Sequence, residues 1–162
     1  MSTPGSKTAA LDAPLHIFGF EFEDLSTRKV SGRLRVTPIC CQSWSAEEEV
    51  LHGGVSAVIA EALASIGAHM ACGFDRIAGV QLSINHFAHA VVGDVVFAEA
   101  VPQYIVKTLQ VWEVKIRKVE PYDRQKQTDD EVVAISRVAV LTNMPVPENA
   151  TAARTLKQFA KL

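Results

Sequence analysis

A single carboxylate, Glu61, stands inside a long run of apolar and small residues between His52 and Cys72. An isolated carboxylate is costly to keep charged in apolar surroundings, so a buried one either pairs with another group or does chemistry. As chemistry, it could attack a carbonyl carbon directly or act as a general base on a water molecule. Ser65 follows four residues later, on the same face of a helix, where its hydroxyl can hydrogen-bond the carboxylate or that water.

The run opens with His52, Gly53 and Gly54. The first N–H groups of a helix lack intrahelical acceptors and carry the positive end of its dipole. They suit an oxygen that becomes negative during a reaction, and glycine lets a substrate approach this backbone with no Cβ in the way. We therefore predict that Gly53 takes part in catalysis and Gly54 in substrate binding. His52 either orients the loop or substrate as part of the catalytic group, or simply caps the helix.

Gly53 and Glu61 are eight residues apart, which is about 12 Å along a helix at 1.5 Å per residue. One carbonyl group cannot contact both residues of the same helix. The two must then come from different subunits, so this interpretation requires at least a dimer with its sites at the subunit interface.

The stretch from about Gly53 to Cys72 lacks proline, is rich in alanine and has apolar residues on every side, which predicts a helix buried all round. Its length would also suit a membrane span. Glu61 at its centre and the glycines at its start argue against a span. We interpret His69, two turns beyond Glu61, as a histidine packed in the core.

Alternating apolar and polar residues predict strands around this helix, at 21–25, 29–37, 79–89, 95–106, 107–120 and 131–143. Short connections favour a mostly antiparallel sheet, and a helix that is apolar all round needs a sheet that curves about it. The expected fold class is α+β, with one domain at 14–148. Around it we expect a disordered segment at 1–13, a short helix or turn at 14–20, loops at 39–51 and 121–130, and a C-terminal helix or tail at 149–162.

The chain of 162 residues is 48% hydrophobic, which is enough for one domain with its own core. Its net charge of −2 gives no reason to expect nucleic acid as a partner. Its three cysteines, of which Cys40 and Cys41 are adjacent, provide neither a disulfide framework nor a metal-ligand spacing. The sequence implies no metal and no redox cofactor, and without a signal peptide we expect an intracellular protein.

The helix motif and the order of elements together resemble the hot-dog fold. His-Gly-Gly with a glutamate nine residues after the histidine resembles the acyl-CoA thioesterases of the 4-hydroxybenzoyl-CoA and phenylacetate-pathway type. Over roughly residues 14–162, the chain is similar to the plant 1,4-dihydroxy-2-naphthoyl-CoA thioesterases of phylloquinone biosynthesis, in the blocks PLHIFGF, GRLRVTPICCQ, AGVQLSINH, GDVVFAEAVP, KTLQVWEVKI and SRVAVLTNMPVP. The resemblance implies hydrolysis of an acyl-CoA thioester by dimers that commonly pair into tetramers.

The resemblance also implies roles for single residues. Glu61 is the catalytic carboxylate, as nucleophile or general base, and a hydroxyl stands at the position of Ser65 in the family. Gln42 matches a glutamine that helps to position the thioester, although residues 43–50 look like a small insertion after it.

The resemblance also places His86 close to the site. His86 and its neighbour Asn85 are expected near the substrate, with a polar strand end as the alternative. For the phosphates of CoA, Lys107, Arg117 and Arg137 could serve by charge.

Other functions stay open at this point. The chain could hydrolyse a different aromatic or a fatty acyl-CoA, act as a hydratase or dehydratase on acyl thioesters, bind acyl-CoA without turnover, or be a structural oligomer in which Glu61 only pairs. The double glycine at the helix start argues against the last three. Hydratases and dehydratases usually carry a catalytic histidine with an Asp or Glu in a different motif, and the other two functions give no reason for such a helix start opposite a lone carboxylate.

The last three residues, Ala160-Lys161-Leu162, are a close variant of the Ser-Lys-Leu address that the peroxisomal import receptor reads. Lys157 adds positive charge upstream, and the polar segment after Pro147 should leave the end exposed. We therefore expect a peroxisomal protein, with a helix end that merely finishes in Lys-Leu as the alternative.

Overall fold

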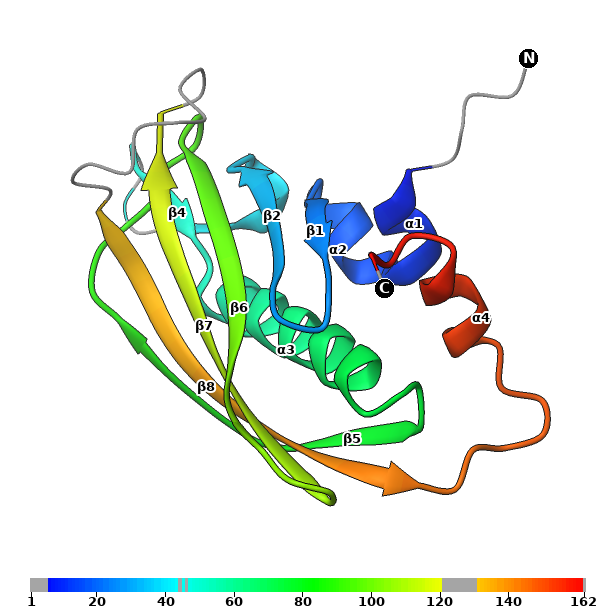
Figure 1. Ribbon diagram of the computed structural model, residues 1–162. Coiled ribbons are helices and arrows are strands. Elements are labelled where there is room, and N and C mark those ends of the chain that lie inside the picture. Colours follow the sequence, from blue (N-terminus) through cyan, green and yellow to red (C-terminus); the bar gives the residue numbers. More distant parts are fainter. Residues whose placement is uncertain (1–5, 44, 46, 121–130, 162) are drawn as a thin grey trace, which may run out of the picture.

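The described residues of this computed structural model, 6–43, 45, 47–120 and 131–161, contain a six-stranded antiparallel sheet as their largest element (Figure 1). In spatial order its strands are β1 (Glu21–Leu25), β2 (Val30–Arg35), β6 (Val95–Ile105), β7 (Leu109–Val119), β8 (Val132–Met144) and β5 (Arg76–His86). All neighbouring strands pair antiparallel. β1 and β5 therefore form the two edges of the sheet.

The long helix α3 (Gly53–Ala71) lies across the concave face of the sheet (Figure 1). Small residues let it approach the strands closely, since a Cβ on Gly67 would lie 2.6 Å from the ring of Trp112. Trp112 Nε1 donates to Gln110 Oε1 at 2.8 Å, and Gln110 Nε2 donates to Ala68 O in the helix at 3.4 Å. The buried side chain of Gln110 thus has partners in both layers, as buried polar groups require.

The core fills the space between α3 and the sheet. Its largest fully buried side chains include Leu34, Ile59, Leu63, Trp112 and Ile116. Burying an aliphatic side chain of this size contributes about 1.5–3 kcal/mol. In β7 every second residue from Gln110 to Ile116 is buried, so the alternation in the sequence turns one face of the strand to the helix. The predicted α+β arrangement, a curved antiparallel sheet wrapped round one helix, is confirmed.

One face of α3 is open, so the prediction of a helix buried all round is wrong. Gly54, Val58 and Glu61 are exposed and follow one another at spacings of four and three residues, which places them on one face. Val58 keeps 37% of its surface exposed. Apart from Glu61 this face consists of small and apolar residues, and for that reason the sequence makes it look buried. Glu61 is accordingly not a buried carboxylate within one chain.

In the described part of the chain, α3 is the one helix long and apolar enough to cross a membrane. Its most apolar stretch is 56% buried inside the fold. Contact with the sheet explains the apolar composition of this helix without a membrane, because the core helix of a globular domain needs the same composition.

The N-terminal segment differs from the disorder expected for residues 1–13. Residues Lys7–Leu11 form helix α1, and Ala13–Phe18 form helix α2 where a short helix or turn was predicted. Thr8 is buried, and its hydroxyl accepts a hydrogen bond from the Phe22 N–H of β1 at 3.3 Å. The small and polar composition of this segment conceals that contact with the sheet. Residues 1–5 lie outside the described residues.

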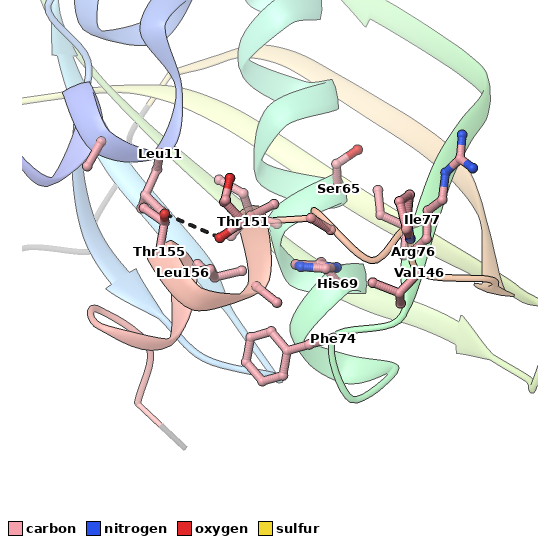
Figure 2. Close-up of a pocket in the computed structure, with 16 residues that line it drawn as sticks. Leu11, Ser65, His69, Phe74, Arg76, Ile77, Val146, Thr151, Thr155 and Leu156 are labelled. Atoms are coloured by element: carbon pink, nitrogen blue, oxygen red, sulfur yellow. Dashed lines mark hydrogen bonds between the residues drawn. The ribbon is translucent and has the colours of Figure 1, made fainter.

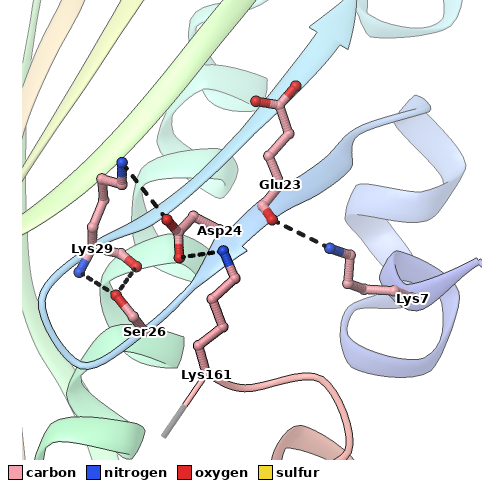
Figure 3. Close-up of polar contacts among 6 residues, drawn as sticks. All are labelled: Lys7, Glu23, Asp24, Ser26, Lys29 and Lys161. Carbon is pink, nitrogen blue, oxygen red and sulfur yellow. Dashed lines mark hydrogen bonds and ion pairs between the residues drawn. The ribbon is translucent and has the colours of Figure 1, made fainter.

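The C-terminal segment is attached to β1 after helix α4 (Ala152–Lys157), in which Leu156 is buried. The Lys161 N–H donates to Leu25 O at 2.8 Å. Figure 3 shows Lys161 Nζ beside Asp24, 3.7 Å from Oδ1, while Lys29 Nζ lies 3.7 Å from Oδ2. An exposed end was expected here, whereas the chain as far as Lys161 is held on the edge strand. Leu162 lies outside the described residues.

Two other element boundaries differ from the prediction. Within the loop predicted at 39–51, a 3-10 turn η1 (Pro38–Cys40) leads to a two-stranded hairpin of β3 (Cys41–Ser43) and β4 (Glu49–Leu51). Strand β5 begins at Arg76 and not at Gly79. Both segments are too short or too irregular to show an alternating pattern. The loop predicted at 121–130 lies outside the described residues.

Candidate active site

The start of α3 carries one N–H group with no acceptor in the described part of the chain, that of Gly53. His52 caps the helix: its Nδ1 accepts from the Gly54 N–H at 2.8 Å and its carbonyl from the Val55 N–H at 2.9 Å. The Gly54 N–H is thus occupied by the cap. Gly53 is left as the donor that can serve an incoming oxygen, at the positive end of the helix dipole.

The imidazole of His86 covers Gly53. A Cβ on Gly53 would lie 3.2 Å from His86 Cε1 and 3.3 Å from Nε2, so a larger residue here would push the ring away by a few tenths of an ångström. Gln42 on β3 and His86 at the end of β5 line a cavity of about 220 Å³ together with Gly53. The fold therefore brings together three of the predicted residues, which we call the helix-start half-site: Gln42, Gly53 and His86.

The predicted carboxylate and hydroxyl meet further along α3. Ser65 Oγ donates to Glu61 Oε1 at 2.7 Å. A Cβ on Gly79 would lie 3.0 Å from Glu61 Oε1, so the carboxylate rests against the backbone of β5 where a side chain would press on it. Glu61, Ser65 and Gly79 form the carboxylate half-site. Our sequence reasoning missed Gly79, although a glycine within a strand is a recognised sign of close approach by another group.

Among the described residues, the cavity at the helix start does not reach the carboxylate half-site. Glu61 and Ser65 are absent from the lining of the cavity at the helix start, and the rise of the helix separates Gly53 from Glu61 by about 12 Å. Within one protomer, the donor and the carboxylate cannot act on the same carbonyl group.

Some predicted residues are placed elsewhere. Asn85 is exposed and alternates with His86 on β5, so it points to the other face of the strand and does not line the cavity at the helix start. Of the three cationic residues named for the CoA phosphates, Arg117 lies over the ring of Phe97 at 4.9 Å and Arg137 pairs in register with Glu113. His52 is observed as the cap of α3, and its role in catalysis stays a prediction.

The cysteine next to Gln42 is a poor nucleophile. Burial, followed by the neighbouring Cys40 thiol and the Glu49 carboxylate, raises the pKa of Cys41 to about 11. Burial also raises the pKa of Cys72. Both thiols stay protonated at neutral pH, and only the thiolate attacks a carbonyl. The carboxylate of Glu61 can attack a carbonyl carbon or act as a general base on water.

A second and larger cavity, of about 540 Å³, begins at Ser65 and extends along the second half of α3 (Figure 2). Its lining is mostly apolar, with residues from α3, β5, α1 and the C-terminal segment including α4. His69, which we interpreted as a packed core residue, is only half-buried and belongs to this lining.

The chain is similar to known proteins over most of its length. The protein 1,4-dihydroxy-2-naphthoyl-CoA thioesterase 2 of Arabidopsis thaliana is 46% identical over 148 residues, which are 90% of this chain and 89% of that protein. The 1,4-dihydroxy-2-naphthoyl-CoA hydrolase of Listeria monocytogenes is 39% identical over 99 residues, 60% of this chain and 76% of that protein. Among solved structures, thioesterase HI1161 from Haemophilus influenzae has the same fold, with a TM-score of 0.71 at 19% identity over 93% of this chain and 96% of that one.

The family profile described as "Thioesterase superfamily" matches residues 48–124. This range contains Gly53 and His86 as well as the complete carboxylate half-site, while Gln42 lies just before it. The hot-dog fold and the resemblance to plant thioesterases that the sequence blocks predicted are both confirmed. The chain therefore belongs to the thioesterase superfamily, as an acyl-CoA thioesterase of the hot-dog fold.

Proposed function

We propose that the protein hydrolyses 1,4-dihydroxy-2-naphthoyl-CoA to 1,4-dihydroxy-2-naphthoate and CoA, a step of phylloquinone biosynthesis. For thioester hydrolysis, the observation that carries the proposal is one helix with a carboxylate at Glu61 and, at Gly53, an N–H that has no acceptor among the described residues. For the acyl group, the support is the name of the Arabidopsis relative and its 46% identity.

The chemistry assigned to each group follows from its position. The Gly53 N–H of one protomer donates to the carbonyl oxygen as that oxygen becomes negative, an interaction worth about 10²–10³ in rate for a single donor. Glu61 of the partner takes a proton from water as the water adds to the carbonyl carbon. The C–S bond then breaks, the sulfur of CoA receives that proton, and the free acid remains. Direct attack by Glu61 would pass through an anhydride that water opens, and it requires the same carboxylate.

A dimer with shared sites is part of this proposal. β5 is an edge strand whose far side pairs with no other strand of the described chain, and such an edge is open to a second strand. Exposed apolar side chains stand on the open face of α3, in β5 and just after β5, with Val58 37%, Val80 53% and Phe87 63% exposed. A second copy that covers them would bring Gly53 of one chain toward Glu61 of the other. The family resemblance extends the proposal to a dimer of dimers.

The test is release of free thiol from a panel of acyl-CoA substrates, measured side by side with purified protein. We expect the highest kcat/KM for 1,4-dihydroxy-2-naphthoyl-CoA, with benzoyl-CoA and 4-hydroxybenzoyl-CoA behind it. A higher kcat/KM for medium- or long-chain fatty acyl-CoA would contradict the acyl group that we assign. Sedimentation of the same preparation checks the assembly, and a fully active monomer would rule out shared sites.

The location that we propose is the peroxisome, with the import receptor as a partner of the C-terminus. The support is the terminal Ala160-Lys161-Leu162, a variant of a known address. Since Lys161 is bonded to Leu25 of β1, a receptor must draw this end away from the edge strand before it can bind. A fluorescent protein fused to the N-terminus, with and without the last three residues, tests the address. Diffuse cytosolic fluorescence from both fusions would contradict it.

A further inference from the structure

The cavity that begins at Ser65 lies beside the carboxylate half-site. Ser65 lines the cavity and at the same time donates its hydroxyl to Glu61 Oε1 at 2.7 Å. A thioester whose carbonyl carbon is within reach of Glu61 therefore has this space next to it. Its volume of about 540 Å³ falls within the roughly 300–1,000 Å³ of small-molecule sites, and its mostly apolar wall is typical of them.

Most of the wall is suited to a flat apolar ring. Figure 2 shows Leu11, Ile77, Val146 and Leu156 around the ring of His69, and Phe74 at one end. Leu11 belongs to α1, Ile77 to β5, and Val146 and Leu156 to the C-terminal segment, so elements far apart in the sequence enclose the same space.

His69 supplies a polar atom in this wall. Its Nδ1 lies 2.9 Å from Asp75 O, and a carbonyl oxygen can only accept, so the proton of the neutral ring is on Nδ1. Nε2 is then an acceptor, and it is buried without a partner among the described residues. Buried acceptors that find no donor are rare in folded proteins and mark sites where a ligand or water can supply one. Nε2 has almost no accessible surface in this structure, so a ring hydroxyl can reach it only after the atoms around it move.

The wall opposite α3 belongs to the C-terminal segment. Thr151, Ala153, Thr155 and Leu156 of the α4 region line the cavity. The superfamily profile matches only residues 48–124, so this wall lies outside the part of the chain that the family profile describes. The position of α4 limits how large a group fits beside Ser65.

We propose that this cavity holds the acyl ring of the substrate, that α4 limits its size, and that His69 Nε2 accepts a hydrogen bond from a ring hydroxyl. The proposal rests on the proposed thioesterase function. It names the acyl group that the cavity beside the carboxylate half-site prefers, which is a hydroxylated fused aromatic ring. His69 is a specificity-determining residue here and takes no part in breaking the thioester bond.

The first experiment compares 4-hydroxy-2-naphthoyl-CoA with 2-naphthoyl-CoA, which differ by one hydroxyl. We expect kcat/KM of the wild type to favour the hydroxylated substrate by about 10-fold, the effect of one neutral hydrogen bond. His69→Phe keeps a ring but has no acceptor, so its kcat/KM for the two substrates should become equal, whatever the common level of activity. His69→Gln, which offers an amide oxygen, should restore part of the preference. An unchanged preference in His69→Phe would overturn the role of His69.

The second experiment tests the wall. Ala153→Trp fills the cavity from α4, and Arg154→Trp on the same helix, outside the lining, is its matched control. Relative to Arg154→Trp, Ala153→Trp should lower kcat/KM for naphthoyl substrates at least 10-fold more than it lowers kcat/KM for acetyl-CoA. Equal losses on both substrates, or equal losses in both variants, would overturn the assignment of the cavity.

A binding measurement separates this inference from the proposed function. Calorimetry with the products 4-hydroxy-2-naphthoate and 2-naphthoate needs no turnover. We expect the wild type to bind the hydroxylated acid about 10-fold more tightly, Ala153→Trp to bind neither, and His69→Phe to bind both equally. Hydrolysis of naphthoyl-CoA with no such pattern of product binding would overturn the cavity assignment alone. Product binding with no thiol release from any acyl-CoA would overturn the proposed function alone.

Discussion

The two cavities along α3 differ in chemistry although one helix supplies both. At the helix start, the cavity of about 220 Å³ has Gln42, His86 and a free backbone N–H in or beside its wall. Beyond Ser65, the cavity of about 540 Å³ is mostly apolar. Polar donors suit an oxygen on which charge develops, whereas an apolar wall suits a part of the substrate that does not react. The comparison shows how one core helix can serve both ends of a substrate, provided that two copies of the chain meet.

The largest effect should come from removing the charge of the carboxylate half-site. Glu61→Gln keeps the shape of the side chain and the acceptor for Ser65 Oγ, but it can neither attack nor take a proton. We expect thiol release to fall at least about 100-fold, the lower end of general-base contributions. Thermal unfolding should be unchanged because Glu61 is exposed in the chain. Activity within a few-fold of wild type would show that the chemistry lies elsewhere.

A somewhat smaller loss is expected at the helix-start half-site. In Gly53→Ala the new Cβ lies 3.2 Å from the His86 ring, which displaces the imidazole and narrows the approach to the N–H. We expect a loss of about 10- to 100-fold, somewhat less than deletion of a donor.

Mixing Gly53→Ala with Glu61→Ala tests whether the two half-sites of one active site come from different chains. A mixed dimer then keeps one intact pair of half-sites. Co-refolded mixtures should regain up to a quarter of wild-type activity, since half of the dimers are mixed and each has one of two sites intact. No recovery, with subunit exchange confirmed by mass spectrometry, would count against shared sites.

Gly79 tests the fine placement of the carboxylate. Gly79→Ala puts a Cβ 3.0 Å from Glu61 Oε1, so the carboxylate must shift by a few tenths of an ångström. Since small misplacements of reacting groups are costly, kcat should fall about 10-fold with little change in KM. Ser83→Ala, on the exposed surface of the same strand, is the control and should behave as wild type. An identical kcat in the two variants would mean that the position of Glu61 is not set by β5.

The smallest effect is expected for a substitution that weakens the attachment of the C-terminal residues after α4 to β1. Asp24→Asn removes the ion pair with Lys161, whose side chain is 71% exposed. Exposed ion pairs contribute about 0–1 kcal/mol, so stability and activity should barely change. Hydrogen exchange at the Lys161 amide, which bonds to Leu25 O, should quicken by a few-fold at most. Exchange as fast as in an unfolded peptide would show that the ion pair, and not the backbone bond, holds the end.

The sequence predicts the long elements of this fold better than its short ones. A strand such as β7 shows its alternation over eleven residues, and α3 shows its composition over nineteen. The hairpin of β3 and β4 has three residues in each strand and no readable period. The open face of α3 was predicted as buried because Gly54 and Val58 have the composition of a core, and a surface suited to a second copy has that composition too.

The spacing of residues within α3 was sufficient to predict the site residues on that helix. The contacts that other elements make with the helix could not be predicted. Gly53, Glu61 and Ser65 follow from position along α3, and Gln42 and His86 from family resemblance. Gly79 and the cavity at His69 depend on how β5, α1 and α4 fold against the helix. The apolar and polar pattern of the chain does not contain that information, because each segment looks ordinary by itself.

The attachment of Lys161 to β1 has a thermodynamic consequence for every partner that requires a free C-terminus. Such a partner binds with an apparent Kd equal to its intrinsic Kd divided by the fraction of molecules whose end is detached, so a fraction of roughly one in a hundred weakens binding about 100-fold. If detachment also loosens the segment that leads back to Leu156 in the cavity wall, the two events are coupled. A ligand that binds better while the C-terminus is attached would then lower the affinity for a partner that binds the detached C-terminus. That partner would lower the affinity for the ligand by the same factor, because coupling between two binding sites is reciprocal.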